Sequence, residues 1–444
     1  MVLFSPAGSR GFDVSTPVVV FRAESYCALG LFRSLGRLGV RVYGVDHSPE
    51  ALGLLSRYCA GRFAWDVDRS PAEATLAFLK DVARRIGGRP LLLPTFDTRS
   101  LLVANHSEEL AEYFRFPRPE PGAVSRLYDK RSMYELCKRL AIPTSETLFP
   151  TTIAEAVAAA DRLGFPVVVK AIDRDRLMRR TGRCLAIVAR RQDLVGVFEA
   201  LDEPGHPNLM LQEFIPGGDD VAWILNGYFN ERSECLFSMT GRRLRQNPVH
   251  TGLTSLGVCQ PCQEIEQSTR RLVQEVGYRG IIDVDYRQDR RDGSFKLLDV
   301  NPRLGATFRL FVDRQGLDVA RSWYLDLTGQ GVPQVQPQWG RRWFVEDKDI
   351  ASCLAYRREG SLGLLDWLKS YGGVREAAHV GLDDLRPTRL FLGGLARRAG
   401  RKVRSLLPGD AGAVRGKPEE GNTPEQYDDG KPSPRRNTSA NQGG

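Results

Sequence analysis

The chain has 444 residues, a length that corresponds to roughly three domains. Its 42% hydrophobic and 26% charged residues are typical of a globular protein and exclude wholesale disorder or a dense disulfide scaffold. The formal net charge is +9, but residues 386–407 hold seven cations and no acid, so the remainder carries only 9 − 7 = +2. A chain with this charge distribution is not expected to bind nucleic acid.

Eight cysteines are scattered along the sequence, and only Cys259 and Cys262 lie close together. Incidental thiols are favoured over a redox pair, and a zinc site would need a second pair of ligands. Residues 1–16 lack the apolar core of a signal peptide. No run of about 18 apolar residues exists, so we expect a cytoplasmic protein without a transmembrane segment.

After a flexible N-terminus, residues 1–15, the pattern predicts a Rossmann-like α/β domain over residues 16–125. Its expected elements are strands at 17–21, 40–45 and 91–94 and a helix at 28–38. Asp97 is a polar tip after the last of these strands. Residues 22–30 lack the Gly-x-Gly-x-x-Gly of dinucleotide sites, so a wall of a substrate site is the favoured interpretation.

Helices and strands are both expected over residues 126–218. They are a helix opened by Asp129 and Lys130, a helix at 151–163, and strands at 166–171, 184–189 and 209–215. The basic stretch 174–183 is predicted to be a loop.

Strands predominate over residues 219–330. The expected elements are strands from 221 to 238, a helix at 268–276, and a hairpin pairing 280–287 with 294–300. We then expect a mostly helical segment at 331–385, a basic amphipathic segment at 386–407 and a disordered tail at 408–444. For the basic segment, a solvated linker is favoured over an interfacial helix.

The stretch from Asp299 to Arg303 is the most informative part of the sequence. Asp299 and Asn301 are two residues apart on a strand and therefore project from one face, and Asp285 lies on the partner strand. Their oxygen atoms are the ligands that Mg²⁺ prefers. Arg303 follows at a position from which a guanidinium can reach phosphate oxygens.

Two upstream features complete a nucleotide site. Lys170 ends an apolar strand, where a lysine is unusual and a positive charge suits phosphates. The second feature is a strand end that offers backbone hydrogen-bonding groups and an apolar surface, followed by carboxylates. A purine and the hydroxyls of its ribose require such groups. This feature comprises Gln212, Glu213, Phe214, Ile215, Asp219 and Asp220.

In this order and spacing, these motifs resemble the ATP-grasp superfamily of carboxylate-amine ligases over residues 16–329. Residues 29–57 and 242–248 are most similar to the D-aspartate ligase-like and carbamoyl-phosphate-synthase-like group. The resemblance implies an ATP-grasp fold with an N-terminal Rossmann-like preATP-grasp domain and mixed α/β and α+β structure. It also implies a small α+β subdomain with a lid over residues 126–218 and a larger one with a metal site over residues 219–330, which clasp ATP between them. It also implies ATP and Mg²⁺ as cofactors, with Mn²⁺ as an alternative metal.

The resemblance implies a role for each motif residue. Lys130 and Lys170 match the nucleotide-binding lysines, Gln212 to Ile215 the adenine hinge, and Asp219 or Asp220 the ribose-binding acid. Asp285, Asp299 and Asn301 match the metal ligands, and Arg303 the arginine near the γ-phosphate.

The sequence departs from the family in two places. The phosphate loop, usually rich in glycine and serine, is rich in arginine over residues 173–183. Asp283 stands where D-alanine ligase relatives have an arginine, so Arg242, Arg243 or Arg303 is expected to stabilise the intermediate. Candidate substrate residues lie in a presumed polar loop: Arg242, Arg245, His250 and Thr251.

The implied function is an ATP- and Mg²⁺-dependent ligase that activates a carboxylate as an acylphosphate and joins it to an amine. Its partners are then a small carboxylate and an amine, and a homodimer is compatible with the family. Two alternatives are an impaired ATP-binding scaffold, suggested by the arginine-rich lid, and a protein that binds a membrane surface through residues 386–407.

Overall fold

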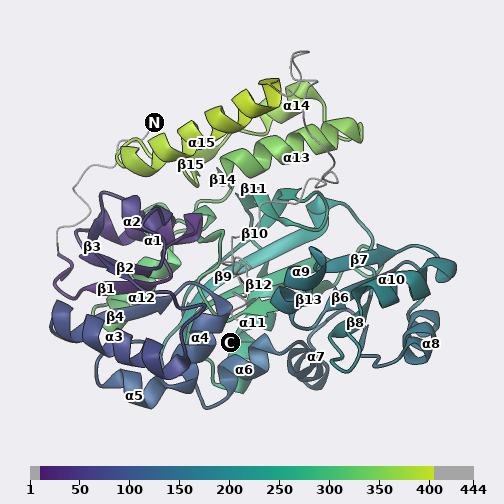
Figure 1. The fold of residues 1–444 in the computed structure, drawn as a ribbon, viewed down its shortest axis with the longest axis horizontal. Coiled ribbons are helices and arrows are strands. Elements are labelled where there is room, and N and C mark those ends of the chain that lie inside the picture. Colours follow the sequence, from purple (N-terminus) through teal and green to yellow (C-terminus); the bar gives the residue numbers. More distant parts are fainter. Residues whose placement is uncertain (1–10, 405–444) are drawn as a thin grey trace, which may run out of the picture.

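The structure is a computed structural model that describes residues 11–404, apart from the side chains of Asp175 and residues 398–404. The predicted tail 408–444 and most of the predicted flexible N-terminus lie outside the described residues. The fold contains three sheets (Figure 1). The domain boundaries expected from the sequence stay a prediction.

The first sheet is parallel, has the strand order β3-β2-β1-β4 and confirms the expected α/β N-terminal domain. Its central strand, Val-Val-Val-Phe, is buried on both faces, as a strand covered by helices on each side requires. The elements are β1 (Val18–Phe21), α1 (Tyr26–Gly36), β2 (Val42–Asp46), α2 (Leu52–Leu55), β3 (Cys59–Ala64), α3 (Ala72–Ile86), β4 (Leu91–Pro94), α4 (Asp97–Asn105) and α5 (Ser107–Ala111).

The second sheet is antiparallel, has the order β5-β8-β6-β7, and packs against α8 and α10. The predicted loop at 174–183 is wrong: residues 174–181 form helix α9. Asp173 caps its first turn by accepting a hydrogen bond from the Arg176 amide, and Gly182 ends it in the left-handed conformation. The elements are β5 (Thr147–Leu148), α8 (Ile153–Leu163), β6 (Val167–Ala171), α9 (Arg174–Thr181), β7 (Leu185–Val188), α10 (Leu194–Leu201) and β8 (Leu209–Glu213).

The third sheet has seven strands in the order β13-β12-β9-β10-β11-β14-β15 and lies at the centre of the molecule (Figure 1). The predicted hairpin is confirmed as β12 and β13. The strands are β9 (Ala222–Phe229), β10 (Cys235–Asn247), β11 (Leu253–Cys259), β12 (Gly280–Gln288), β13 (Phe295–Asn301), β14 (Arg342–Phe344) and β15 (Val374–Ala377).

Two hydrophobic cores cover the faces of this sheet. One core joins it to α6 (Ala123–Tyr128), α7 (Lys130–Arg139) and α11 (Gln263–Val276). The other core joins it to α12 (Val319–Leu327) and to α1 of the N-terminal domain. The N-terminal domain and the seven-stranded sheet therefore share one continuous apolar interior.

The segment expected to be mostly helical also supplies strands, so that prediction is wrong in part. Its helices are α13 (Glu346–Arg358) and α14 (Leu364–Lys369), while β14 and β15 extend the seven-stranded sheet. Fully buried Arg33 of α1 donates from Nε to Asp384 (3.0 Å), which also accepts a hydrogen bond from Ser56. The C-terminal segment is thereby bound both to the sheet and to the N-terminal domain.

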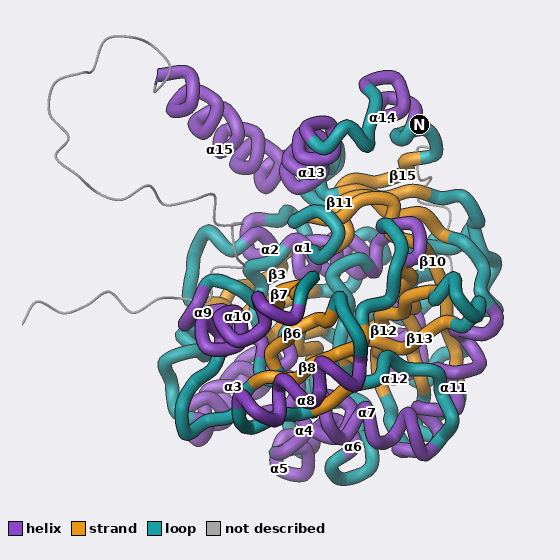
Figure 2. The backbone as a smooth tube through the Cα atoms, turned by 90° about the vertical axis from the view of Figure 1, so that its right-hand side faces the viewer, coloured by secondary structure: helices purple, strands orange, loops and turns teal. Residues whose placement is uncertain are grey.

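The prediction that the basic segment is a solvated linker is also wrong, because residues 385–404 form helix α15 (Leu385–Arg404). Helices α13, α14 and α15 lie along one end of the molecule in both views (Figures 1 and 2). Within residues 11–404, no helix combines the length and apolar character needed to span a bilayer.

Candidate active site

The hairpin of β12 and β13 places four polar side chains on one face of the seven-stranded sheet. Asp285 pairs directly with Asp299, and Asp283 pairs with Asn301. Residues opposite each other on antiparallel strands share a face, so all four project together. The intervening Val284 and Val300 are fully buried in the core beneath. The predicted metal ligands are therefore adjacent.

Basic side chains from three other parts of the chain meet this face. Lys130, at the start of α7, forms an ion pair with Asp299, and Arg243 of β10 forms one with Asp285. Burial alone would raise the pKa of Asp299, but the positive charges of Lys130 and Lys170 outweigh it and lower this pKa to about 2. Asp299 is thus an anion held among cations across the physiological range.

Lys170 lies on β6 of the second sheet, near Asp299. Burial lowers the pKa of the Lys170 ammonium and the neighbouring Lys130 lowers it further, whereas Asp299 opposes the shift. Lys130 lies on helix α7, Lys170 on the second sheet, and the two aspartates on the seven-stranded sheet. The structure therefore brings together the predicted nucleotide-binding lysines and the predicted metal ligands.

Arg303 connects the cluster to the N-terminal domain. Its guanidinium donates two hydrogen bonds to Asp97 (2.6 and 3.1 Å) at the start of α4, and a longer one to the Asn301 amide oxygen (3.4 Å). Asp97 is the polar residue that follows strand β4 (Leu91–Pro94). In this conformation the predicted catalytic arginine is held by a carboxylate in bidentate geometry.

Asp283 is the acid at the position where the family resemblance suggested an arginine. It is 8% exposed, and its pKa rises to about 7 because of burial and the nearby charge of Asp285. Asn226 of β9 donates to it at 3.3 Å, and a methyl group on Gly305 would lie 2.1 Å from its Oδ1. Alternation along the strand places Asp283 on the face of Asp285, so the sequence contains a signal for this position.

Arg242 does not lie with this cluster in the structure, and its catalytic role stays a prediction. The paired registers align Asp285 with Ile224 and Gly241 on one face, and put Arg242 with Trp223 and Tyr286 on the other. Arg243 occupies the face of Asp285. Successive strand residues point to opposite faces, so a choice between two neighbouring arginines depends on register.

The residues predicted to form a polar substrate loop do not all lie in a loop. Arg242 and Arg245 belong to β10, and Arg245 is buried in a bidentate ion pair with Asp349 of α13 (2.8 and 2.7 Å). His250 does follow in a loop, where its ring nitrogens contact Asp219 (3.3 Å) and Glu359 (3.0 Å). Thr251 is exposed in the same loop. Arg245 is thus a structural residue here.

The predicted adenine hinge, Gln212–Ile215, spans the end of β8, and its side chains bond to the surrounding elements. Gln212 donates to the Thr147 hydroxyl (3.1 Å), and Glu213 accepts from Lys296 (3.0 Å) and from Arg291. Phe214 is half-buried, Ile215 is buried, and the Ile215 carbonyl accepts from Arg287 (2.9 Å).

The two candidate ribose acids differ in environment. Asp219 is buried and accepts from the Tyr356 hydroxyl of α13, a partner that no sequence motif indicated. Asp220 is exposed and pairs with Arg290. Burial raises the pKa of Asp219, although the His250 imidazole opposes the shift. Of the two, Asp220 is the more accessible.

Helix α9 contributes positive charge beside Lys170. Arg174, its first residue, adds to Lys130 and Lys170 in lowering the pKa of Asp299. Arg176 pairs with Glu203 (2.7 Å), which fixes the helix to the loop before β8. The arginine-rich stretch therefore lies next to the charged cluster as an ordered helix.

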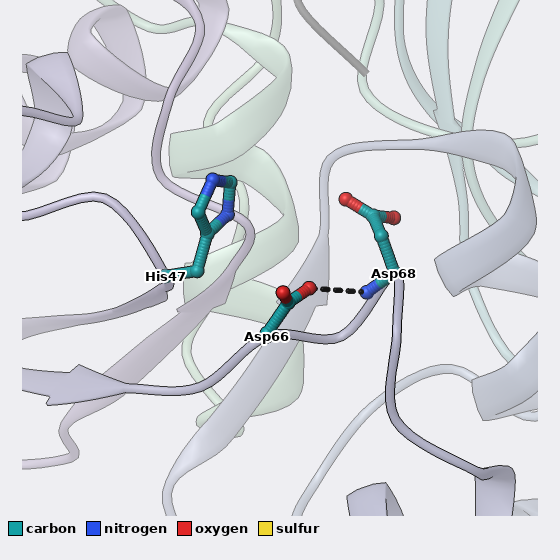
Figure 3. Close-up of side chains that lie close together, drawn as sticks. All are labelled: His47, Asp66 and Asp68. Atoms are coloured by element: carbon teal, nitrogen blue, oxygen red, sulfur yellow. Dashed lines mark hydrogen bonds between the residues drawn. The ribbon is translucent and has the colours of Figure 1, made fainter. Parts of the chain in front are cut away.

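A separate group of potential metal ligands lies in the N-terminal domain. His47, Asp66 and Asp68 present ligand atoms within 4.8 Å of one another, and Asp66 accepts a hydrogen bond from the Asp68 amide (Figure 3). The Asp68 carboxylate is bound by Arg22 (2.9 Å) and Arg99. We assign no metal to this group, because exposed acids paired with arginines need none.

All eight cysteines are free thiols, and Cys259 and Cys262 are buried. Burial raises the pKa of each of these two thiols to about 12. Such thiols are unreactive, in agreement with the favoured interpretation as incidental residues.

The three sheets form an ATP-grasp fold. No protein-family model matches the chain. Its sequence is similar to D-aspartate ligase of Enterococcus faecium (strain Aus0004), with 28% identity over 268 residues, which cover 57% of this chain and 63% of that protein. It is also similar to the C-terminal section of the carbamoyl phosphate synthase large chain of Methanopyrus kandleri, with 25% identity over 50% of this chain and 41% of that one. The match thus spans less than two thirds of either relative.

Solved structures support the same fold. N5-carboxyaminoimidazole synthase from Aspergillus clavatus, in complex with ADP and 5-aminoimidazole ribonucleotide, superposes with a TM-score of 0.57 at 15% identity, over 74% of this chain and 81% of that one. L-amino acid ligase from Bacillus licheniformis gives 0.54 at 13% identity, over 73% and 78%. The expected ATP-grasp fold is therefore confirmed.

Proposed function

We propose that the chain is an ATP- and Mg²⁺-dependent ligase that joins a small carboxylate to an amine. The observation that carries this proposal is the single polar face on which Asp285 and Asp299 meet Lys130, Lys170 and Arg243. Carboxylates alone suit a metal, and cations alone suit a phosphate, but a metal-bound polyphosphate needs both. The similarity to D-aspartate ligase and carbamoyl phosphate synthase supports the same activity.

The donor set fits magnesium in its chemistry. Asp285, Asp299 and Asn301 offer oxygen ligands only, without the sulfur or imidazole that zinc favours. These three residues would hold Mg²⁺, or Mn²⁺ in its place, and the metal would neutralise phosphate charge and act as a Lewis acid. Lys130 and Lys170 would then bind phosphate oxygens and release Asp299 from its present ion pair.

The proposed chemistry has two steps. An oxygen of the substrate carboxylate attacks the γ-phosphorus of ATP, forming an acylphosphate while the bond to ADP breaks. The amine nitrogen then attacks the acyl carbon, inorganic phosphate leaves, and the nitrogen loses a proton. In this proposal Arg243 and Arg303, both beside the metal ligands, stabilise the negative oxygen of the tetrahedral intermediate.

We place ATP with its adenine against the segment Gln212–Ile215 and its ribose near Asp220. The buried Ile215 and half-buried Phe214 offer an apolar wall, and Asp220 is the exposed acid that follows them. A cytoplasmic location is part of the proposal, since all eight cysteines are free thiols.

The test is ADP release by the purified chain with Mg-ATP and a panel of D- and L-amino acids and other carboxylates, each with and without an amine. Asp285→Asn and Asp299→Asn should each abolish carboxylate-dependent ADP release. Asp292→Asn is the matched control, because it makes the same change at an exposed turn of the same hairpin. It should retain full activity.

One outcome would contradict the ligase activity and another the proposed metal site. Nucleotide binding without turnover across the panel would favour an ATP-binding scaffold. ADP release that persists in Asp299→Asn would mean that the hairpin is not the metal site.

A further inference from the structure

Exposed apolar side chains gather at the end of the molecule formed by α13, α14 and α15. Of the 14 large apolar residues classed as exposed among those described, nine lie between residues 350 and 392. They are Ile350, Leu354, Leu364, Leu365, Leu368, Leu382, Leu385, Leu390 and Leu392. Such clustering on one surface is unusual for a soluble protein and marks a site of interaction.

The same end carries the positive charge of the chain. Helix α15 contains seven cations and no acidic residue. Arg386, Arg389 and Arg397 line a single surface hollow together with Leu385 and Leu390. Cations and apolar side chains therefore share one surface of the helix instead of lying on opposite faces.

Helix α15 is attached to the body by its first turns. Thr388 is buried and its hydroxyl accepts from the Gly381 amide (3.0 Å), while the Phe391 ring stacks on His379 with centroids 4.2 Å apart. The far end of α15 projects away from the rest of the protein (Figure 2). The attachment fixes the direction in which the cations are presented.

We propose that α14 and α15 form a docking surface for an anionic lipid bilayer. Arginines bind lipid phosphates, and leucines beside them enter the boundary between headgroups and acyl chains. A duplex nucleic acid would match the charge but leave Leu365 and Leu368, which are 70% and 61% exposed, without a partner. The combination of both features selects the membrane, and the enzyme would work at that surface.

Co-sedimentation of the full-length chain tests the proposal. We expect binding to vesicles of phosphatidylcholine and phosphatidylglycerol in equal amounts, and none to phosphatidylcholine alone. Each cation contributes about fivefold to such binding, so replacing Arg386, Arg389 and Arg397 by glutamine should weaken it by roughly a hundredfold. The control replaces exposed Arg69, Arg84 and Arg85 by glutamine at the other end of the molecule and should bind normally.

A second variant separates the apolar contribution. Leu365→Ser with Leu368→Ser should lower vesicle binding at every salt concentration, because apolar insertion is not screened by salt. All variants should keep the thermal midpoint of the unmodified chain, since the changed side chains are exposed.

Three results would overturn the proposal. They are equal binding to neutral and anionic vesicles, no effect of the three glutamines, or a salt-matched affinity for double-stranded DNA above that for vesicles. A fall in molecular mass by light scattering in the leucine variant would assign the surface to a second copy of the chain.

Discussion

Gly305 lies against the buried Asp283 of β12, and we expect that replacing this glycine by alanine lowers the stability of the protein. The added Cβ would lie 2.1 Å from Oδ1, 2.3 Å from Cγ and 2.8 Å from Cβ of Asp283. The contact involves the root of the side chain, so a rotation of the carboxylate cannot relieve it. Overpacking of this kind costs about 1–3 kcal/mol.

The assay is urea denaturation of Gly305→Ala, followed by tryptophan fluorescence. The control is Gly331→Ala, where an added Cβ has open space and an ordinary backbone conformation. We expect Gly305→Ala to lose about 1–3 kcal/mol of unfolding free energy and the control to change by about 0.5 kcal/mol or less. Asp283→Ala in the Gly305→Ala background should recover part of the loss, because it removes the clashing carboxyl group.

Equal stability of Gly305→Ala and Gly331→Ala would refute this reasoning. It would mean that the backbone at Gly305 moves away from β12 without cost, and that Asp283 is not packed as described.

Three further predictions concern stability at acid pH, the accessibility of the thiols, and helix α9. Burial alone would raise the pKa of Glu376, but the positive charges of Arg309 and Arg341 outweigh it and lower this pKa from 4.5 to about 2. Ionised Glu376 therefore contributes about 3 kcal/mol to the free energy of unfolding. This contribution is present above about pH 4.5 and is lost as the pH falls toward 2. Glu376→Gln should therefore melt lower than the unmodified chain at pH 7, with the gap closing toward pH 2; a constant gap would contradict the shift. At pH 8, Ellman's reagent should reach at most the three half-buried thiols, Cys59, Cys184 and Cys235, and all eight after denaturation; rapid reaction of more than three in the native protein would show that the buried thiols are accessible. Arg174→Gln should raise the KM for Mg-ATP about tenfold with little change in stability, whereas Arg179→Gln, at an exposed position of the same helix, should not; equal values would remove α9 from the phosphate site.

The hairpin of β12 and β13 could be predicted because the sequence signals for it are local. Alternation puts Asp299 and Asn301 on one face, and the short turn at 289–293 identifies the partner strand that carries Asp285. The exact pairing of Asp285 with Asp299 could not be predicted from spacing, because it depends on an irregularity between Asp285 and Tyr286 that shifts the register by one residue. The start of α7 is local as well: Asp129 accepts from the Ser132 amide (2.8 Å), as an N-cap should.

Features that depend on distant pairing could not be predicted. Arg245 looks like a polar loop residue until β10 is extended and Asp349, 104 residues later, is buried against it. Strands β14 and β15 have three and four residues, too few for a periodic signal, and they are strands because an edge of the sheet is free beside them. Helix α9 is a different case, since Asp173 and Gly182 gave cap signals at both ends that its many arginines obscured.

The order in which the sheet is assembled has a consequence for synthesis on the ribosome. Strands β9 to β13 leave the ribosome first, but β14, β15 and the buried partner of Arg33, Asp384, follow only after a further 41 to 83 residues, counted from Asn301 to Arg342 and Asp384. Until then β11 is an open edge and Arg33 is an unpaired guanidinium at the surface of α1. An open edge of this kind pairs readily with other chains. Nascent chains stalled before residue 342 should therefore be the aggregation-prone form of this protein and the form on which chaperones act.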